Sequence, residues 1–269
     1  MKKRFTLSFL LLTFVAQAQV IPVGFIKATY NTSFPTGNNP VTDNLLLYLD
    51  ATRRLSYDAS GSIWSDIRGV SPANSATLVG SPTFSVSNNV GSFTFAADKY
   101  ALTSTLISSL SAATFIAWVN PSWTQSNYTG IILSRNGYAN ATGNACGLII
   151  TMENFTNLVS YVWNGTPDTY NWRSPSLTVP NNQWSMIAVS ITSTGAAFYV
   201  VNSSGTIRAT NGNAHSAVSG HQFYVGVDPF DILNRAFKGK IATSMVYSTA
   251  LIQTNIVDIF NAQKASFGL

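Results

Sequence analysis

The chain has 269 residues, of which 46% are hydrophobic and 12% aromatic, enough apolar material for a sizeable core in one all-β domain. Only 9% of the residues are charged, against about a quarter in an average domain, and Asn, Ser and Thr supply the polar surface instead. The formal charge is +5, but basic residues cluster only at the N-terminus, which argues against nucleic-acid binding. This composition is more typical of an extracellular or virion-exposed β-sandwich than of a cytosolic enzyme.

Residues 1–18 have the pattern of a secretory signal peptide. Three basic residues at positions 2–4 precede an apolar run at 5–15, and Ala-Gln-Ala follows at 16–18. The run is too short to span a bilayer, and its removal leaves 12 basic against 10 acidic residues. We therefore expect a secreted or cell-surface protein with no membrane span in the mature chain. An uncleaved anchor and a buried N-terminal strand are the alternatives.

The remaining chain is divided by its turn residues. Residues 19–42 are rich in Thr, Asn, Pro and Gly and are interpreted as an N-terminal extension or linker before one domain at 43–269. Alternating residues at 45–49 predict the first strand, and residues 52–75, around Trp64, are interpreted as a long loop. Further strands are expected at 91–96, 113–120, 130–134, 147–152, 157–163, 184–192, 196–201, 222–227 and 236–247.

One helix is expected, at about residues 253–264. Ile252, Ile256, Ile259 and Phe260 recur at helical spacing and form one apolar stripe, and Gly268 stands where a helix C-terminal signal belongs. The stripe is expected to pack on the protein's own sandwich, with a partner-binding surface as the alternative.

The order of the strand motifs resembles that of laminin-G-like, concanavalin A-like modules across residues 43–269. The matching segments are Leu45–Ala51, Ile63–Asp66, Gly91–Phe95, Thr114–Val119, Trp184–Val189, and Gly239–Ile241 with Val246-Tyr247. This resemblance implies an all-β fold, a concanavalin A-like jelly-roll sandwich of two antiparallel sheets with one short C-terminal helix. The C-terminal variant is similar to modules of tailed-phage and giant-virus structural proteins and of bacterial secreted proteins.

Two positions depart from the family pattern. Ile252 stands where the family commonly has a Ser that caps the helix, so Thr249 is expected to cap it instead. Ala242 and Thr243 replace an acidic pair after Gly-Lys-Ile, which weakens any expectation of an acidic surface or metal contact there.

The superfamily includes retaining glucanases, whose chemistry needs two carboxylates about 5–5.5 Å apart. Glu153 is the only glutamate, its neighbours contain no second carboxylate, and no Asp cluster has the required spacing. We therefore predict no catalytic residues.

No metal ligands or cofactors are predicted either. Asp228 and Asp231 form the densest acidic segment and are the place where calcium would bind, but such residues are more often ordinary turn residues. His215 and His221 lack metal-ligand spacing and are expected in loops or at the surface. Cys146, the only cysteine, lies in an apolar strand and is expected to be a small buried hydrophobe.

Sugar binding would use exposed aromatic rings beside amide groups. The best candidate segment lies at 161–173, and a second candidate site contains Trp123 and Tyr128. The predicted ligand-binding residues are Trp163, Asn164, Asp168, Tyr170, Trp172, Arg173, Trp123 and Tyr128. For Trp163 and Trp172 a core position is equally expected, whereas Trp118 and Trp184 lie in apolar strands and are expected in the core.

The favoured function is non-catalytic extracellular recognition of surface glycans or of a protein partner, through aromatic stacking and amide hydrogen bonds. One alternative is a structural subunit of a virion, tail fibre or extracellular filament, for which homo-oligomer or filament assembly and a virion surface would be expected. A glycoside hydrolase is the second alternative.

Overall fold

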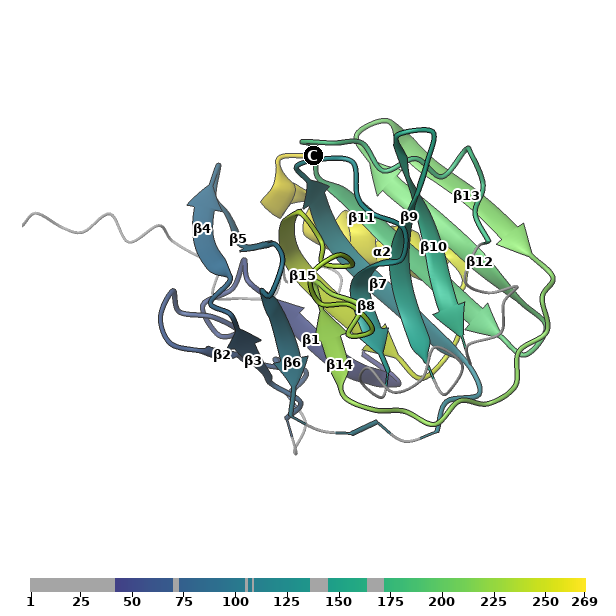
Figure 1. Ribbon diagram of the computed structural model, residues 1–269, viewed down its shortest axis with the longest axis horizontal. Helices are drawn as coiled ribbons and strands as arrows, with labels where there is room; N and C mark the ends of the chain where they lie inside the picture. Colours follow the sequence, from purple (N-terminus) through teal and green to yellow (C-terminus); the bar gives the residue numbers. More distant parts are fainter. Residues whose placement is uncertain (1–41, 70–72, 105, 108, 136–144, 164–171) are drawn as a thin grey trace, which may run out of the picture.

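Two antiparallel sheets stack face to face in the computed structural model, which describes residues 42–69, 73–104, 106–107, 109–135, 145–163 and 172–269 (Figure 1). The strands are β1 (Leu45–Asp50), β2 (Ile63–Trp64), β3 (Ala76–Val79), β4 (Thr83–Ser87), β5 (Val90–Phe95), β6 (Tyr100–Thr103), β7 (Ala113–Pro121), β8 (Thr129–Ser134), β9 (Cys146–Glu153), β10 (Thr156–Trp163), β11 (Ser185–Thr192), β12 (Gly195–Asn202), β13 (Gly205–Asn211), β14 (Phe223–Val225) and β15 (Gly239–Tyr247). They are followed by the helix α2 (Gln253–Gln263) and the 3-10 turn η2 (Lys264–Phe267).

The first sheet, here called the back sheet, has the order β13-β12-β11-β7-β15-β5-β4, and β1 also pairs with β15. The second, the front sheet, has the order β10-β9-β8-β14-β6-β3-β2. Both sheets also pair strands that are far apart in the chain, such as β7 with β15 and β8 with β14, as in a jelly roll, and the expected sandwich of two antiparallel sheets is confirmed.

The central strand β7 shows how the core is built. Successive side chains of a strand point to opposite faces, so Phe115, Ala117 and Val119 enter the core between the sheets while Ile116 and Trp118 face outward. All five are fully buried, because the outer face of the back sheet is covered too. A strand covered on both faces reads as a continuous apolar run, which is why β7 was predicted nearly to its ends.

The covering element is the C-terminal segment, and the prediction that its apolar stripe packs on the sandwich is confirmed. Ile256, Ile259 and Phe260 are buried against the outer face of the back sheet. Trp118 fixes the segment, because its ring is stacked on Phe267 with centroids 3.8 Å apart. Burial of each large apolar side chain contributes about 1.5–3 kcal/mol, so packing rather than capping holds the helix in place.

The capping prediction is wrong at one end of this segment and right at the other. Ile252 is the N-cap, its backbone is extended, and no side chain caps the helix, so Thr249 does not take that role. Gly268 adopts a left-handed φ of 72°, and its N–H donates a hydrogen bond to the Ala265 carbonyl, which ends η2. Within the described residues, no helix has the length and apolar character needed to cross a membrane.

Several strands lie where none was expected, namely β2, β3, β4, β6 and β13. The strand β13 is exposed at most of its positions and carries Thr, Arg and Asn. It is the edge of the back sheet, and an edge strand with polar side chains gives no apolar alternation to recognise.

Candidate functional site

The predicted site residues fall into separate parts of the structure. Asn164, Asp168 and Tyr170 lie outside the described residues. Trp163 ends β10 with only 1% of its surface exposed, and its indole N–H donates to the Ser216 carbonyl at 2.7 Å. A ring enclosed in this way presents no face to a sugar, so Trp163 occupies the core position that was one of its two expected roles.

His215, expected in a loop or at the surface, lies in a loop but is buried, with its ring edge-on to Trp163 at a centroid distance of 6.0 Å. Its Nδ1 is 2.8 Å from the Thr192 carbonyl, an acceptor, so Nδ1 carries the proton and Nε2 accepts from the Tyr161 hydroxyl at 2.7 Å. Burial lowers the pKa of His215, because the charged imidazolium would lose water that these neutral partners do not replace.

Trp172 and Arg173 form the described end of the first candidate segment. Trp172 is half-buried and stacks on Phe198 with centroids 4.1 Å apart, so one ring face is already covered. Arg173 forms an ion pair with Glu153 at 3.0 Å. The hydrogen bond from Arg173 lowers the pKa of Glu153, which favours the ionised form of this carboxyl group. A glycosidase general acid needs the opposite shift.

Trp123 is the predicted aromatic that the structure leaves open to solvent. Its side chain is 71% exposed on the loop between β7 and β8. Phe155, at the turn between β9 and β10, is 84% exposed and joins this loop through a hydrogen bond from the Thr124 hydroxyl to its carbonyl. We call Trp123 and Phe155 the aromatic rim. Phe155 was missed because an isolated aromatic in a polar turn carries no sequence signal of its own.

Two buried amide side chains hold the Trp123 loop in one conformation. The side-chain oxygen of Asn157 accepts from the Gln125 backbone N–H at 2.7 Å, and its amide donates to the Trp123 carbonyl at 3.2 Å. The Gln125 amide also donates to the Trp123 carbonyl and to the Lys238 carbonyl, at 2.7 and 2.9 Å. Asn157 and Gln125 are each 2% exposed, so the loop is fixed by shielded hydrogen bonds while its aromatic side chain faces water.

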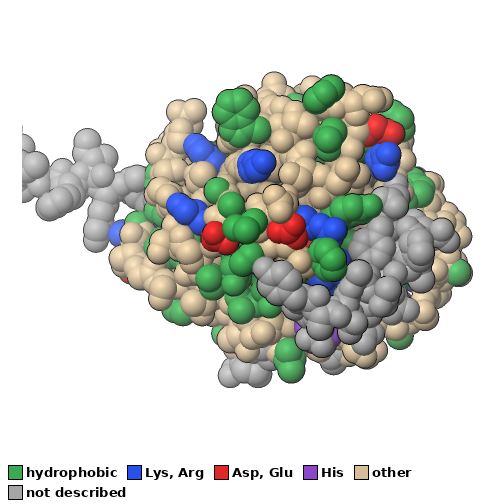
Figure 2. Space-filling view, in the orientation of Figure 1, with side chains coloured by type: hydrophobic (Ala, Val, Ile, Leu, Met, Phe, Trp, Pro, Cys, Tyr) green, Lys and Arg blue, Asp and Glu red, His purple; other side chains and the backbone are tan. Residues whose placement is uncertain are grey.

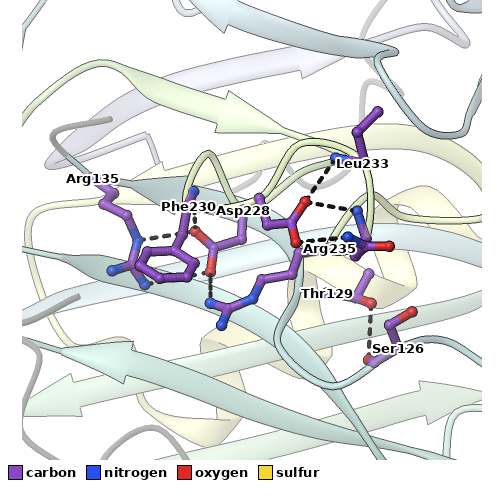
Figure 3. Close-up of polar contacts among 9 residues, drawn as sticks. Ser126, Thr129, Arg135, Asp228, Phe230, Leu233 and Arg235 are labelled. Atoms are coloured by element: carbon purple, nitrogen blue, oxygen red, sulfur yellow. Dashed lines mark hydrogen bonds and ion pairs between the residues drawn. The ribbon is translucent and has the colours of Figure 1, made fainter. Parts of the chain in front are cut away.

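Tyr128, the remaining predicted residue, packs against a charged cluster of Asp228, Arg135 and Arg235, which Figure 3 shows. The Arg235 guanidinium lies between two rings, 4.7 Å from the Tyr128 centroid and 4.3 Å from that of Phe230. The Asp228 carboxylate is fully buried between Arg235, at 2.9 Å, and Arg135, also at 2.9 Å. Tyr128 therefore packs against a cation rather than joining Trp123 in one open aromatic surface.

The same cluster confirms the interpretation of Asp228 and Asp231 as turn residues. Asp228 accepts from the Phe230 backbone N–H at 3.0 Å, and Asp231 accepts from the backbone of Leu233 and Asn234 at 3.2 and 3.0 Å. Among the residues that the structure describes, no group of three or more His, Cys, Asp or Glu side chains could hold a metal ion. The face drawn in Figure 2 carries few charged side chains, and its acidic side chains lie next to basic ones.

Cys146 is buried, as expected of a small hydrophobe. Its thiol is 1% exposed, and burial raises its pKa to about 12. A thiol in this state is not a nucleophile near neutral pH.

Comparisons with known proteins agree with the fold. The model of the family described as the concanavalin A-like lectin/glucanases superfamily matches residues 91–257. No curated protein matches the chain. Domain 4 of AbnA, a GH43 extracellular arabinanase from Geobacillus stearothermophilus in complex with arabinotriose, is similar with a TM-score of 0.58 and 15% identity, over 80% of this chain and 98% of that one.

Two further solved structures are similar over only part of their own length. Trypanosoma rangeli sialidase in complex with sialic acid has a TM-score of 0.56 and 13% identity, over 83% of this chain and 33% of that one. An arabinofuranosidase complexed with arabinofuranosyl-alpha-1,2-xylobiose has a TM-score of 0.55 and 10% identity, over 77% and 51%. At these identities, the similarity to the three solved structures shows a shared fold alone. The family model covers more than half of the chain, which therefore belongs to the concanavalin A-like lectin/glucanase superfamily.

Proposed function

We propose that the protein is an exported, non-catalytic module that binds surface glycans through the aromatic rim. One observation carries the proposal: Trp123 is 71% exposed on a loop whose backbone is held by buried hydrogen bonds from Asn157 and Gln125. Tryptophan is enriched at binding surfaces, and the apolar face of a pyranose is a natural partner for an indole.

The rigidity of the loop adds to this argument. A binding surface that is already ordered loses less conformational freedom when the ligand arrives, so more of the contact energy appears as affinity. Glycan binding is also consistent with the arabinanase domain, which was solved with arabinotriose and matches this chain over 98% of its own length. Export rests on the signal-peptide pattern of residues 1–18.

The absence of a catalytic step is part of the proposal. Glu153, the only glutamate, is paired with Arg173 and has a lowered pKa. Asp228 is buried between two arginines and is inaccessible to a substrate. Neither carboxyl group is suited to protonate a leaving group.

A glycan array tests the proposal with the purified protein and three variants. Trp123→Ala and Phe155→Ala should weaken binding, Trp123→Ala by more than tenfold if the ring is a binding hot spot worth about 2 kcal/mol. Leu55→Ala is the matched control, because Leu55 is similarly exposed at 68% but lies elsewhere. Binding to no glycan, or binding that both rim variants leave intact, would overturn the site. Release of reducing sugar from a bound glycan would overturn the non-catalytic assignment.

A further inference from the structure

A hollow of about 200 Å³ lies on the outer face of the back sheet, beside the end of the C-terminal segment. It is lined by Ser87, Asn88, Val90, Ser92, Asn120, Asn182, Trp184, Lys240 and Phe267. The lining comes from the β4–β5 hairpin, from β7 and β15, and from the turn before β11, so only the folded topology brings these groups together.

The strand register explains the centre of the hollow. Asn120 of β7 is directly opposite Lys240 of β15, which places the two side chains next to each other on one face. That face is the outer one, because Trp118, two residues before Asn120, packs under the C-terminal segment. Asn182 is held at the edge by a hydrogen bond from its backbone N–H to the Pro121 carbonyl at 2.7 Å.

Most polar side chains that line the hollow have no partner among the described residues. In the part of the chain that the structure describes, the side chains of Asn88, Asn120, Asn182, Trp184 and Lys240 form no hydrogen bond or ion pair. The structural amides of the Trp123 loop differ, because the side chains of Gln125 and Asn157 form hydrogen bonds within the protein. The five side chains of the hollow named above are exposed or half-buried, so water completes their hydrogen bonds, and a polar ligand that enters the hollow can replace that water.

The chemistry of these groups defines a class of ligand. Trp184 offers an aromatic face and a free indole N–H, and its ring is oriented by an edge contact with Phe267, with centroids 5.2 Å apart. The three Asn amides can each donate and accept hydrogen bonds, as sugar hydroxyls require. Lys240 supplies a cation, and no acidic side chain lines the hollow to neutralise it.

We propose that this hollow binds a sugar residue that carries a carboxylate, a uronic acid. The ring lies against Trp184, its hydroxyls bond to the Asn amides, and its carboxylate pairs with Lys240. The hollow contains neither Trp123 nor Phe155, so the inference does not depend on the aromatic rim.

The test is an NMR titration of the protein with glucuronic and galacturonic acids, and with glucose and galactose as neutral counterparts. The indole N–H signal of Trp184, assigned by its loss in Trp184→Phe, should shift with the acids. Lys240→Met should weaken acid binding by about tenfold, because a hydrogen bond to a charged group is lost, and Lys240→Arg should retain it. Lys238→Met is the matched control, since Lys238 is an exposed lysine two residues away.

The outcomes separate this site from the rim. Trp123→Ala should leave the uronic acid titration unchanged, so the rim proposal can fail while this one stands. The inference is overturned if neither acid shifts the Trp184 signal, if glucose or galactose binds equally well, or if Lys238→Met weakens binding as much as Lys240→Met. Loss of acid binding in Trp123→Ala would also overturn it.

Discussion

Asn157→Ala should destabilise the protein by roughly 2–6 kcal/mol, although the residue lies next to the binding surface and not on it. The substitution removes three hydrogen bonds, one from Gln125 at 2.7 Å and two from the Asn157 amide, to Trp123 at 3.2 Å and to Asn181 at 2.9 Å. The Gln125 N–H would be left without an acceptor in a buried site, which costs about 1–3 kcal/mol. Each of the other two bonds contributes about 0.5–1.5 kcal/mol.

Thermal and urea unfolding measure this effect. A domain of this size loses about 2–4 °C in midpoint per kcal/mol, so a fall of roughly 4–24 °C is expected. Asn181→Ala is the graded control, because it removes only the 2.9 Å bond and should cost about 1 kcal/mol. If Asn157→Ala changes the free energy of unfolding by less than about 0.5 kcal/mol, as an ordinary surface substitution would, the account of the loop is wrong. Glycan affinity should fall in the same variant, because the Trp123 loop would then have to become ordered on binding.

Three further predictions concern buried polar groups. Gln263→Leu should cost about 1–3 kcal/mol in urea unfolding, because the buried indole N–H of Trp118 loses its 2.7 Å acceptor, whereas Gln263→Glu keeps an acceptor. The folded pKa of His215 is lowered, so the unfolded chain binds more protons and stability should fall as the pH drops below about 6.5. His215→Gln should flatten that dependence between roughly pH 5 and 7 in thermal unfolding. Cys146, with a pKa near 12, should react with iodoacetamide only after denaturation, which mass spectrometry can follow.

The sequence predicted the strands that have at least one face fully buried by other parts of the protein. The strand expected at 113–120 was found as Ala113–Pro121, and the helix expected at 253–264 as Gln253–Gln263. The strand Gly205–Asn211 was missed, because most side chains of this edge strand are exposed to solvent and need not be apolar. An apolar pattern reports burial, so it reveals a strand only where at least one face of that strand is covered.

The site was harder to predict because alternation does not say which face of a strand is the inner one. Tyr161 and Trp163 alternate along β10 and both enter the core, whereas their position beside a polar loop suggested an open surface. Trp123 was named as part of a second candidate site with Tyr128, and it is the member of that pair that the structure leaves exposed. The hollow beside Trp184 was not, since its amides at positions 88, 120 and 182 converge only through the sheet order.

Two tryptophans that touch the same phenylalanine show what distinguishes a structural ring from a binding ring in this protein. Phe267 stacks on Trp118 and meets Trp184 edge to face. The indole N–H of Trp118 is satisfied by Gln263, because that ring is sealed under the C-terminal segment. The indole N–H of Trp184 has no partner among the described residues and lines a hollow with unpaired amides. Both rings were expected in the core, and their apolar strands are alike. The difference lies in whether the protein completes its own hydrogen bonds, and a group that the fold positions firmly but leaves incomplete is available to a ligand.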